Sequence, residues 1–441
     1  MVRKKLVLIG AGSAMFTRGL LMDLIEKEKK TKEKWHMALV DIDPSALEPT
    51  RLLCEKMVKA SEADIEISYS TDRCEVLSNA DYIVSTIGVG GRRAWEQDVF
   101  IPRKYGIYQP VGDSVAPGGI SRAMRMIPAL LDITGDIVKH CPKAYFFNYA
   151  NPMTSICRAI RKATGFPVIG LCHGVKNGEK RLARFAGLDS KKVSSYALGI
   201  NHMVFIHDIR CDGVNAWPEV KNKLDELKVS GNYASIEVGP LSRGFIEAYG
   251  AYPASDDRHF SEFTQGNLHK DGYFGKTLGK DAYSFEKTIE DGDEIYHETK
   301  ELAYSDAPLP AGFFKRSEGE HEQLMDIIQS IEHDERKIFS VNVPNNFAFQ
   351  ELPGYAVLEM PAAATVNGFM QLKIDKFDPI LTGILAKHIE ICEITVEAAL
   401  KGDRRLFSEA ILMGGYIEDR STVERMVEEL LKAQRKYLPQ F

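Results

Sequence analysis

The stretch Lys5–Ser13, KLVLIGAGS, decides the fold of this 441-residue chain. Its apolar start predicts a buried parallel strand ending at Ile9, and Gly10-Ala11-Gly12 predicts a tight turn into the helical run that follows. This order is typical of a dinucleotide-binding fold, because the glycines let backbone N–H groups approach a pyrophosphate at the helix N-terminus. The fingerprint is incomplete, since Met15 stands where a third glycine is expected.

The second predicted strand, residues 36–40, ends in an acidic residue that selects the cofactor. Asp41 lies where a carboxylate accepts hydrogen bonds from the adenosine ribose hydroxyls, and it would repel the 2′-phosphate of NADP. The alternative is a helix-capping or turn residue. We therefore expect NAD, with contacts from Gly10, Gly12, Ser13, Met15, Phe16, Asp41 and Gly88.

Strands and helices alternate through the next hundred residues. A helix is predicted over 46–59, and strands are predicted over 65–69, 81–87 and 144–149. This pattern indicates an α/β protein with a Rossmann-like, doubly wound parallel sheet, similar to lactate and malate dehydrogenases. Short strands at 340–343 and 356–360 are expected to form a second sheet. We expect a NAD-binding domain over 1–200 and an interleaved α+β domain for substrate binding and oligomerisation over 201–441.

Composition excludes several classes of protein. The net charge of -6, without a basic block, argues against nucleic acid or an anionic membrane as a partner. No stretch approaches the ~20 apolar residues that a membrane span needs. Seven cysteines, an odd number scattered along the chain, do not suggest a disulfide framework. We expect a cytoplasmic protein with reduced thiols.

Polar side chains follow the predicted strands at the edge where the ligand site of a parallel sheet lies. Arg92 follows a glycine-rich turn and could meet a substrate anion or a cofactor phosphate, or it could be a solvated surface residue. Asp113 lies in a loop and is a candidate general acid, with an Asx turn as the alternative. Asn151 could bind a sugar hydroxyl or the nicotinamide.

Cys172 follows the apolar run VIGL, and His202 lies at the end of a second segment, LGINHM. Thiolate and imidazole bind borderline-soft divalent metals, and two ligands leave room for water or substrate. A buried free cysteine and an unrelated histidine are the alternative. Further on, GAYPASDDRHFSEF, residues 250–263, gathers proton-transfer and anion-binding side chains, although a solvated polar loop has a similar composition.

Taken together, KLVLIGAGS, ALVDID, GDSVAPGGI, NYANPM, GLCHG and LGINHM occur in the order seen in glycoside hydrolase family 4, and this resemblance covers almost the whole chain. The segments YGIYQPVGDSVAPGG and GAYPASDDRHFSEF are most similar to the α-galacturonidase branch. The resemblance implies NAD-assisted oxidation at C3 of the sugar, deprotonation at C2, elimination at C1, addition of water and re-reduction at C3. It also implies a homodimer or homotetramer.

The resemblance assigns roles to residues of this chain. Cys172 and His202 would hold Mn²⁺, Asp113 would protonate the leaving oxygen, and Asn151 would bind substrate. For the C2 base we favour Asp257, with Asp256, Tyr249 and Tyr252 as alternatives. Arg258 or Arg92 would pair with a uronate carboxylate, because a planar guanidinium binds it through two hydrogen bonds.

Other functions stay open at this point. An α-galactosidase, α-glucosidase or α-glucuronidase of the same family would share these motifs. A malate- or lactate-type dehydrogenase would share the first domain but would not need a cysteine-bound metal. A non-catalytic NAD sensor would have no reason to gather Asp113, Cys172, His202 and Asp257.

Overall fold

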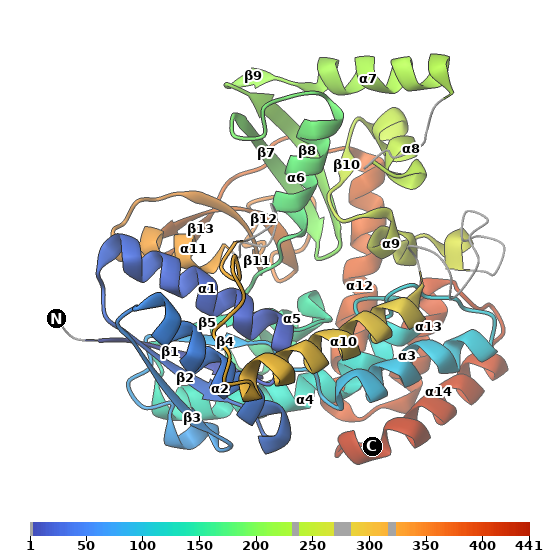
Figure 1. The fold of residues 1–441 in the computed structure, drawn as a ribbon. Helices are drawn as coiled ribbons and strands as arrows, with labels where there is room; N and C mark the ends of the chain where they lie inside the picture. The colour runs from blue at the N-terminus through green and yellow to red at the C-terminus, as the bar shows by residue number, and fades with distance from the viewer. Residues whose placement is uncertain (1–2, 232–237, 269–283, 316–322) are drawn as a thin grey trace.

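The computed structural model describes residues 3–231, 238–268, 284–315 and 323–441 (Figure 1). Within these residues one 13-stranded mixed sheet runs through the molecule in the order β10-β8-β7-β12-β11-β6-β5-β4-β1-β2-β3, with β13 pairing to β12 and β9 to β8. The first six strands are parallel to one another: β1 Lys4–Ile9, β2 Trp35–Val40, β3 Ile65–Ser70, β4 Tyr82–Ser85, β5 Tyr145–Asn148 and β6 Ile169–Gly170. This parallel α/β arrangement confirms the expected fold class.

The remaining strands pair antiparallel: β7 Val193–Ile200, β8 Met203–Cys211, β9 Val214–Asn215, β10 Tyr252–Pro253, β11 Ile338–Pro344, β12 Val357–Thr365 and β13 Gly368–Gln371. The expectation of a second sheet was wrong, because β11 pairs with β6 and so extends the first sheet. Gly170 permits this junction, since a Cβ at this position would lie 2.8 Å from the Cβ of Asn342. The domain boundary at residue 200 stays a prediction.

Helices cover both faces of the sheet (Figure 1). In chain order they are α1 Ala14–Thr31, α2 Pro44–Ser61, η1 Arg73–Glu75, α3 Gly91–Lys104, α4 Ala116–His140, α5 Met153–Thr164, α6 Gly174–Phe185, α7 Trp217–Ser230, α8 Pro240–Tyr249, α9 Asp257–Phe260, η2 Ser261–Phe263, η3 Gln265–Leu268, α10 Phe285–Tyr304, α11 Leu324–Glu332, α12 Pro379–Lys401, α13 Arg404–Gly414, α14 Arg420–Gln434 and η5 Arg435–Tyr437. Among the described helices, none is long and apolar enough to cross a membrane.

Strand β1 shows how the sequence builds the core. Its side chains alternate between two faces, as the strand geometry requires. Leu6 and Leu8 join an apolar core shared with α1 and α2, whereas Val7 and Ile9 join a core shared with α4 and α5. Burial on both faces explains why the run KLVLI is almost continuously apolar.

Candidate active site

The glycine turn after β1 forms an open cradle at the start of α1. Gly10 has a φ of +93°, and a Cβ there would lie 2.7 Å from the backbone nitrogen of Ile87. A Cβ on Gly12 would lie 2.7 Å from Oδ2 of Asp41, the atom that accepts the Gly12 N–H at 2.9 Å. The N-cap residue Ser13 makes no side-chain capping hydrogen bond. The geometry fits a pyrophosphate at this helix end.

The other residues predicted for the cofactor lie around this turn. Asp41 follows β2, and burial raises the pKa of its carboxyl although the N–H groups of Asp43 and Gly12 oppose this change. The Phe16 ring packs 5.5 Å from the ring of Tyr149. Gly88 follows β4, with Nη2 of Arg122 3.7 Å from the position of a Cβ. Met15 lies in α1, and its side chain is outside the described part of the structure.

Asp113 is the centre of a polar network at the carboxyl edge of the parallel strands. Its Oδ2 accepts a hydrogen bond from Asn151 Nδ2 at 2.9 Å, and its Oδ1 accepts one from Ser114 Oγ at 2.7 Å. The Ser114 hydroxyl also contacts Nδ1 of His202 at 2.8 Å. The loop before α4, the segment after β5 and the hairpin between β7 and β8 therefore meet at the Asp113 carboxylate.

The protonation of Asp113 depends on its neighbours. Burial raises the pKa of its carboxyl, but the imidazoles of His202 and His259 and the Arg122 guanidinium outweigh burial and bring this pKa below its usual value. A general acid needs a proton, so Asp113 can act as an acid only in the fraction of molecules that carry one. The structure thus places this residue in the network, and its acid role stays a prediction.

Asn151 has one amide atom without a partner in the described part of the chain. Its Nδ2 binds Asp113 and its backbone oxygen accepts a hydrogen bond from Arg122 Nε at 3.0 Å. Its Oδ1 is buried and has no hydrogen-bond partner among the residues that the structure describes. A buried acceptor without a donor is costly, so this oxygen fits a substrate hydroxyl.

His202 sits in the two-residue connection between β7 and β8, with a φ of +66°. The adjacent Asn201 donates to Glu359 Oε2 at 3.1 Å, and the Ser255 hydroxyl donates to the backbone oxygen of His202. Burial and the neighbouring His259 lower the pKa of His202, so its ring is neutral at pH 7. A neutral imidazole whose Nδ1 is occupied by Ser114 is oriented to bind a metal through Nε2.

Cys172 lies just beyond the end of β6, before α6. Its Sγ accepts the backbone N–H of Gly174 at 3.3 Å, and its backbone oxygen accepts a hydrogen bond from Gln323 Nε2 at 3.3 Å. An N–H donor and a helix N-terminus both favour the thiolate that a metal ion requires. The donor set of Cys172 and His202 therefore fits a borderline-soft divalent metal.

The two neighbouring aspartates of the GAYPASDDRHFSEF segment have different surroundings. Asp257 accepts backbone N–H groups from Leu241 at 2.8 Å and Ser242 at 3.0 Å, so both its oxygens bind the start of α8. Asp256 caps α9, where its Oδ1 accepts the backbone N–H of His259 at 3.0 Å, and it also contacts Nδ1 of the His259 ring at 2.7 Å. The His259 ring lies 4.6 Å from the ring of His202. Both aspartates thus bind the start of a helix, and Asp256 also reaches the network through the His259 ring.

The remaining residues predicted for the site have protein partners. Tyr252 is buried and accepts a hydrogen bond from Arg181 Nε at 3.3 Å, and burial raises the pKa of its hydroxyl. The Tyr249 ring packs 5.2 Å from Phe245. Arg92 binds Asp293 at 2.7 Å and lies over the Tyr296 ring. Arg258 donates to the Pro110 oxygen at 3.1 Å and to the Thr288 hydroxyl.

Sequence reasoning gave no role to four residues that the structure adds to the network. Ser114 links Asp113 to His202, His259 links Asp256 to His202, and the half-buried Arg122 lies beside Asn151. Glu262 accepts the N–H groups of Val111 at 2.7 Å and Gly112 at 2.8 Å, which fixes the loop before Asp113. Ser114, His259 and Glu262 lie within motifs that the sequence analysis quotes, whereas Arg122 lies outside every one of them.

Comparison with known proteins agrees with this geometry. Residues 5–188 match the model of the family 4 glycosyl hydrolases, and residues 197–414 match the C-terminal domain of the same family. The chain is 27% identical to an α-galactosidase of Bacillus subtilis over 99% of this chain and 100% of that protein. It is 28% identical to an α-galacturonidase of Thermoanaerobacterium saccharolyticum over 98% of this chain and 95% of that protein.

Solved structures show the same fold. A 6-phospho-α-glucosidase from gut microorganisms, solved with NAD and glucose-6-phosphate, superposes with a TM-score of 0.86 at 20% identity, over 100% of both chains. A malate dehydrogenase of Cryptosporidium parvum superposes with a TM-score of only 0.53 at 13% identity, over 90% of this chain and 99% of that chain. The two family models together span most of the sequence, and the chain belongs to glycosyl hydrolase family 4.

Proposed function

We propose that this glycosidase hydrolyses α-galacturonides with NAD and Mn²⁺ as cofactors. The observation that carries the proposal is the network in which Asp113 binds Asn151 and Ser114 and reaches His202 through the serine hydroxyl. It places a carboxylate, a buried amide acceptor and a neutral imidazole at one edge of the sheet, beside the nucleotide cradle. Relatives named α-galacturonidase, at 25–28% identity, support the substrate class.

Each cofactor would supply one kind of chemistry. NAD, on the cradle formed by Gly10 and Gly12, would take a hydride from C3 and return it. Mn²⁺, held by Cys172 and His202, would act as a Lewis acid toward the sugar hydroxyl oxygens. The solved relatives include a 6-phospho-α-glucosidase from gut microorganisms with NAD and Mn²⁺.

The residues of the chain itself would handle protons and position the sugar. The free Oδ1 of Asn151 would accept a hydroxyl hydrogen bond. Asp113 would give its proton to the leaving glycosidic oxygen. The sequence favours Asp257 as the base at C2, but both its oxygens bind the start of α8, so we propose Asp256, which contacts the His259 ring, in its place. A cation for the uronate would come from Arg258 or from the half-buried Arg122.

A substrate panel tests the proposal. Nitrophenyl α-galacturonide, α-galactoside, α-glucoside and α-glucuronide would be assayed with NAD⁺, Mn²⁺ and a reductant. We expect the galacturonide to give the highest kcat/KM, with no net accumulation of NADH. Hydrolysis in D₂O should place deuterium at C2 of the released sugar, and a product without deuterium would refute the elimination mechanism.

An α-galactosidase is the second candidate, because an α-galactosidase of Bacillus subtilis matches the chain over its full length. Arg258→Ala separates the two substrates. This substitution should reduce kcat/KM for the uronide far more than for the neutral galactoside, and equal losses would argue against a uronate partner. The cytoplasmic location and the homo-oligomeric state stay predictions.

A further inference from the structure

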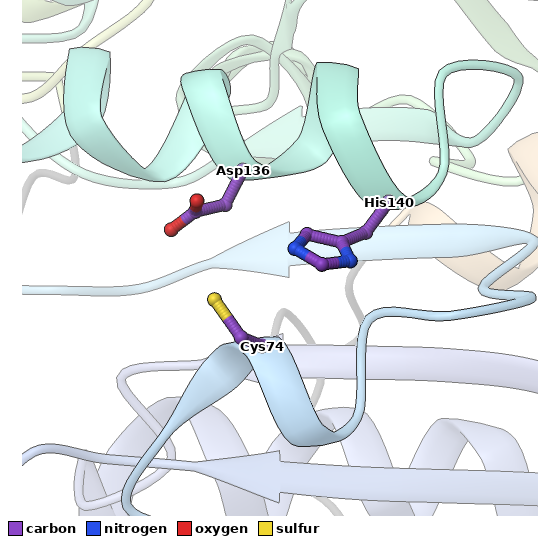
Figure 2. A group of neighbouring side chains, drawn as sticks. All are labelled: Cys74, Asp136 and His140. Carbon is purple, nitrogen blue, oxygen red and sulfur yellow. The ribbon is translucent and has the colours of Figure 1, made fainter.

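A second group of metal-binding side chains lies at the far end of α4 from the candidate active site. It contains Cys74 of η1 and Asp136 and His140 of α4, drawn in Figure 2. One possible ligand atom from each of the three side chains lies within 4.8 Å of the other two. Helix α4 begins at Ala116, beside the Asp113 loop, and its 25 residues place His140 roughly 37 Å away along the axis.

Local structure explains why these side chains meet. Asp136 and His140 are four residues apart, so they share one face of α4. Asp72 caps η1 by accepting the Cys74 N–H at 2.9 Å, which turns the thiol toward the helix. Arg73 binds Oδ2 of Asp136, with its Nε at 2.8 Å, and also pairs with Asp132.

One atom of the group lacks the partner that its burial requires. Nε2 of His140 is shielded from solvent and has no hydrogen-bond partner in the described structure. Figure 2 shows a ring nitrogen of His140 pointing toward the other two side chains. A buried nitrogen without a partner is costly, and a cation would relieve that cost through the nitrogen lone pair.

The charge of the surroundings also favours a cation. Three carboxylates, those of Asp72, Asp132 and Asp136, surround the group, and Arg73 is the guanidinium that pairs with two of them. His140 is the last residue of α4, where the carbonyl ends of the helix carry partial negative charge. A divalent ion would therefore improve the local charge balance.

We propose that Cys74, Asp136 and His140 form a second metal site, of the zinc type, separate from the Cys172–His202 pair. Sulfur, nitrogen and carboxylate oxygen are the donors that Zn²⁺ accepts, and three protein ligands leave a fourth position for water. Binding would release the thiol proton of Cys74 to solvent, since the thiolate is the ligand. The ion would tie η1 to the end of α4 and act on stability.

The second three-residue group in the described structure provides a matched control. Glu33, Glu332 and His333 also lie within ligand distance of one another. Lys4 pairs with Glu33 at 2.7 Å and with Glu332 at 2.8 Å, so ammonium groups already neutralise these carboxylates. We expect no zinc binding there, and His333→Gln should leave zinc binding by the protein unchanged.

The test uses full-length protein stripped of metal and titrated with Zn²⁺ or Co²⁺, with bound metal measured after dialysis. Cys172→Ser first removes the cysteine ligand of the proposed catalytic site. In that background one equivalent should still bind, and Co²⁺ should give a thiolate charge-transfer band. Adding Cys74→Ser should abolish the band and weaken binding by more than the about 10- to 100-fold cost of losing an outer-shell partner.

His140→Gln in the same background provides a second variant, in case the serine changes the fold. Circular dichroism of the metal-free variants would verify that the fold is retained. Zn²⁺ should raise the Tm of Cys172→Ser but not of either double variant. Loss of all zinc binding in Cys172→Ser, or a charge-transfer band that survives Cys74→Ser, would refute the second site. Neither result depends on the substrate or mechanism proposed above.

Discussion

The parallel and antiparallel parts of the sheet both contribute to the candidate active site, but in different ways. In the parallel part, Asp41 and Asn151 follow strand ends and Asp113 lies in the loop before α4. In the antiparallel part, His202 lies in a hairpin and Asp256 reaches the network through His259. Parallel strands bring their carboxyl ends to one edge, so position in the sequence predicts position in space. The antiparallel part has no such rule.

The largest expected effect concerns the parallel part. Asp113→Asn should lower kcat on a substrate with a poor leaving group by about 10²- to 10⁴-fold, because general acid assistance is lost. The loss should be smaller for a nitrophenyl glycoside, whose leaving oxygen needs little protonation. Asp132→Asn, on the exposed face of α4, is the control. Equal losses on both leaving groups would contradict the acid role.

The aspartate pair tests the antiparallel part. Asp256→Asn should lower kcat by about 10²-fold or more and slow the exchange of the C2 proton in D₂O. Asp257→Ala should instead lower the free energy of unfolding by about 0.5–2 kcal/mol, because the start of α8 loses its acceptor. Urea unfolding and D₂O exchange of both variants would check this. The reverse pattern would restore Asp257 as the base.

We expect Glu262 to make the folding stability of the protein depend on pH. Burial and the nearby Asp113 raise the pKa of this carboxyl to about 7, although the N–H groups of Gly112 and Val111 oppose the shift. The normal pKa of a glutamate carboxyl in an unfolded chain is about 4.3. Above that pH the unfolded state releases a proton that Glu262 still holds in the folded state. Stability should fall as pH rises between these values, by up to about 3 kcal/mol, and should level off above pH 7. Urea unfolding of Glu262→Gln should show a free energy of unfolding that depends less on pH. An unchanged pH dependence would mean that another group causes it.

The smallest expected effect concerns Ser114, which connects the parallel and antiparallel parts of the site. Ser114→Ala removes the hydroxyl between Asp113 and Nδ1 of His202, so the imidazole loses its orienting partner. We expect about a tenfold loss of Mn²⁺ affinity, the lower end of the cost of an outer-shell change. Ser421→Ala, in the exposed first turn of α14, is the control. Unchanged Mn²⁺ affinity would mean that His202 is oriented by its hairpin alone.

These contrasts explain how much the sequence could predict. The six parallel strands, the glycine cradle and the polar strand ends follow from hydrophobic runs and turn residues, which act locally. The continuation of the sheet through β11 depends on Gly170 meeting Asn342, residues that are 172 positions apart in the chain. Nothing local distinguishes Asp256 from Asp257 either, because the start of α8 binds only one of them. Arg92 likewise acquires its role from Asp293, on the distant helix α10.

The pairing of β6 with β11 has a consequence for how a sugar would enter. Many enzymes close two lobes around a ligand by a hinge motion. Here the backbone of Gly170 is bonded into both parts of one sheet, through Phe147–Ile169 and Asn148–Gly170 pairing on one side and Asn342 on the other. Separating the parts would break this seam and expose backbone groups that the core now shields. We therefore expect the sugar to enter through movements of loops and covering helices, with the sheet itself staying in one piece.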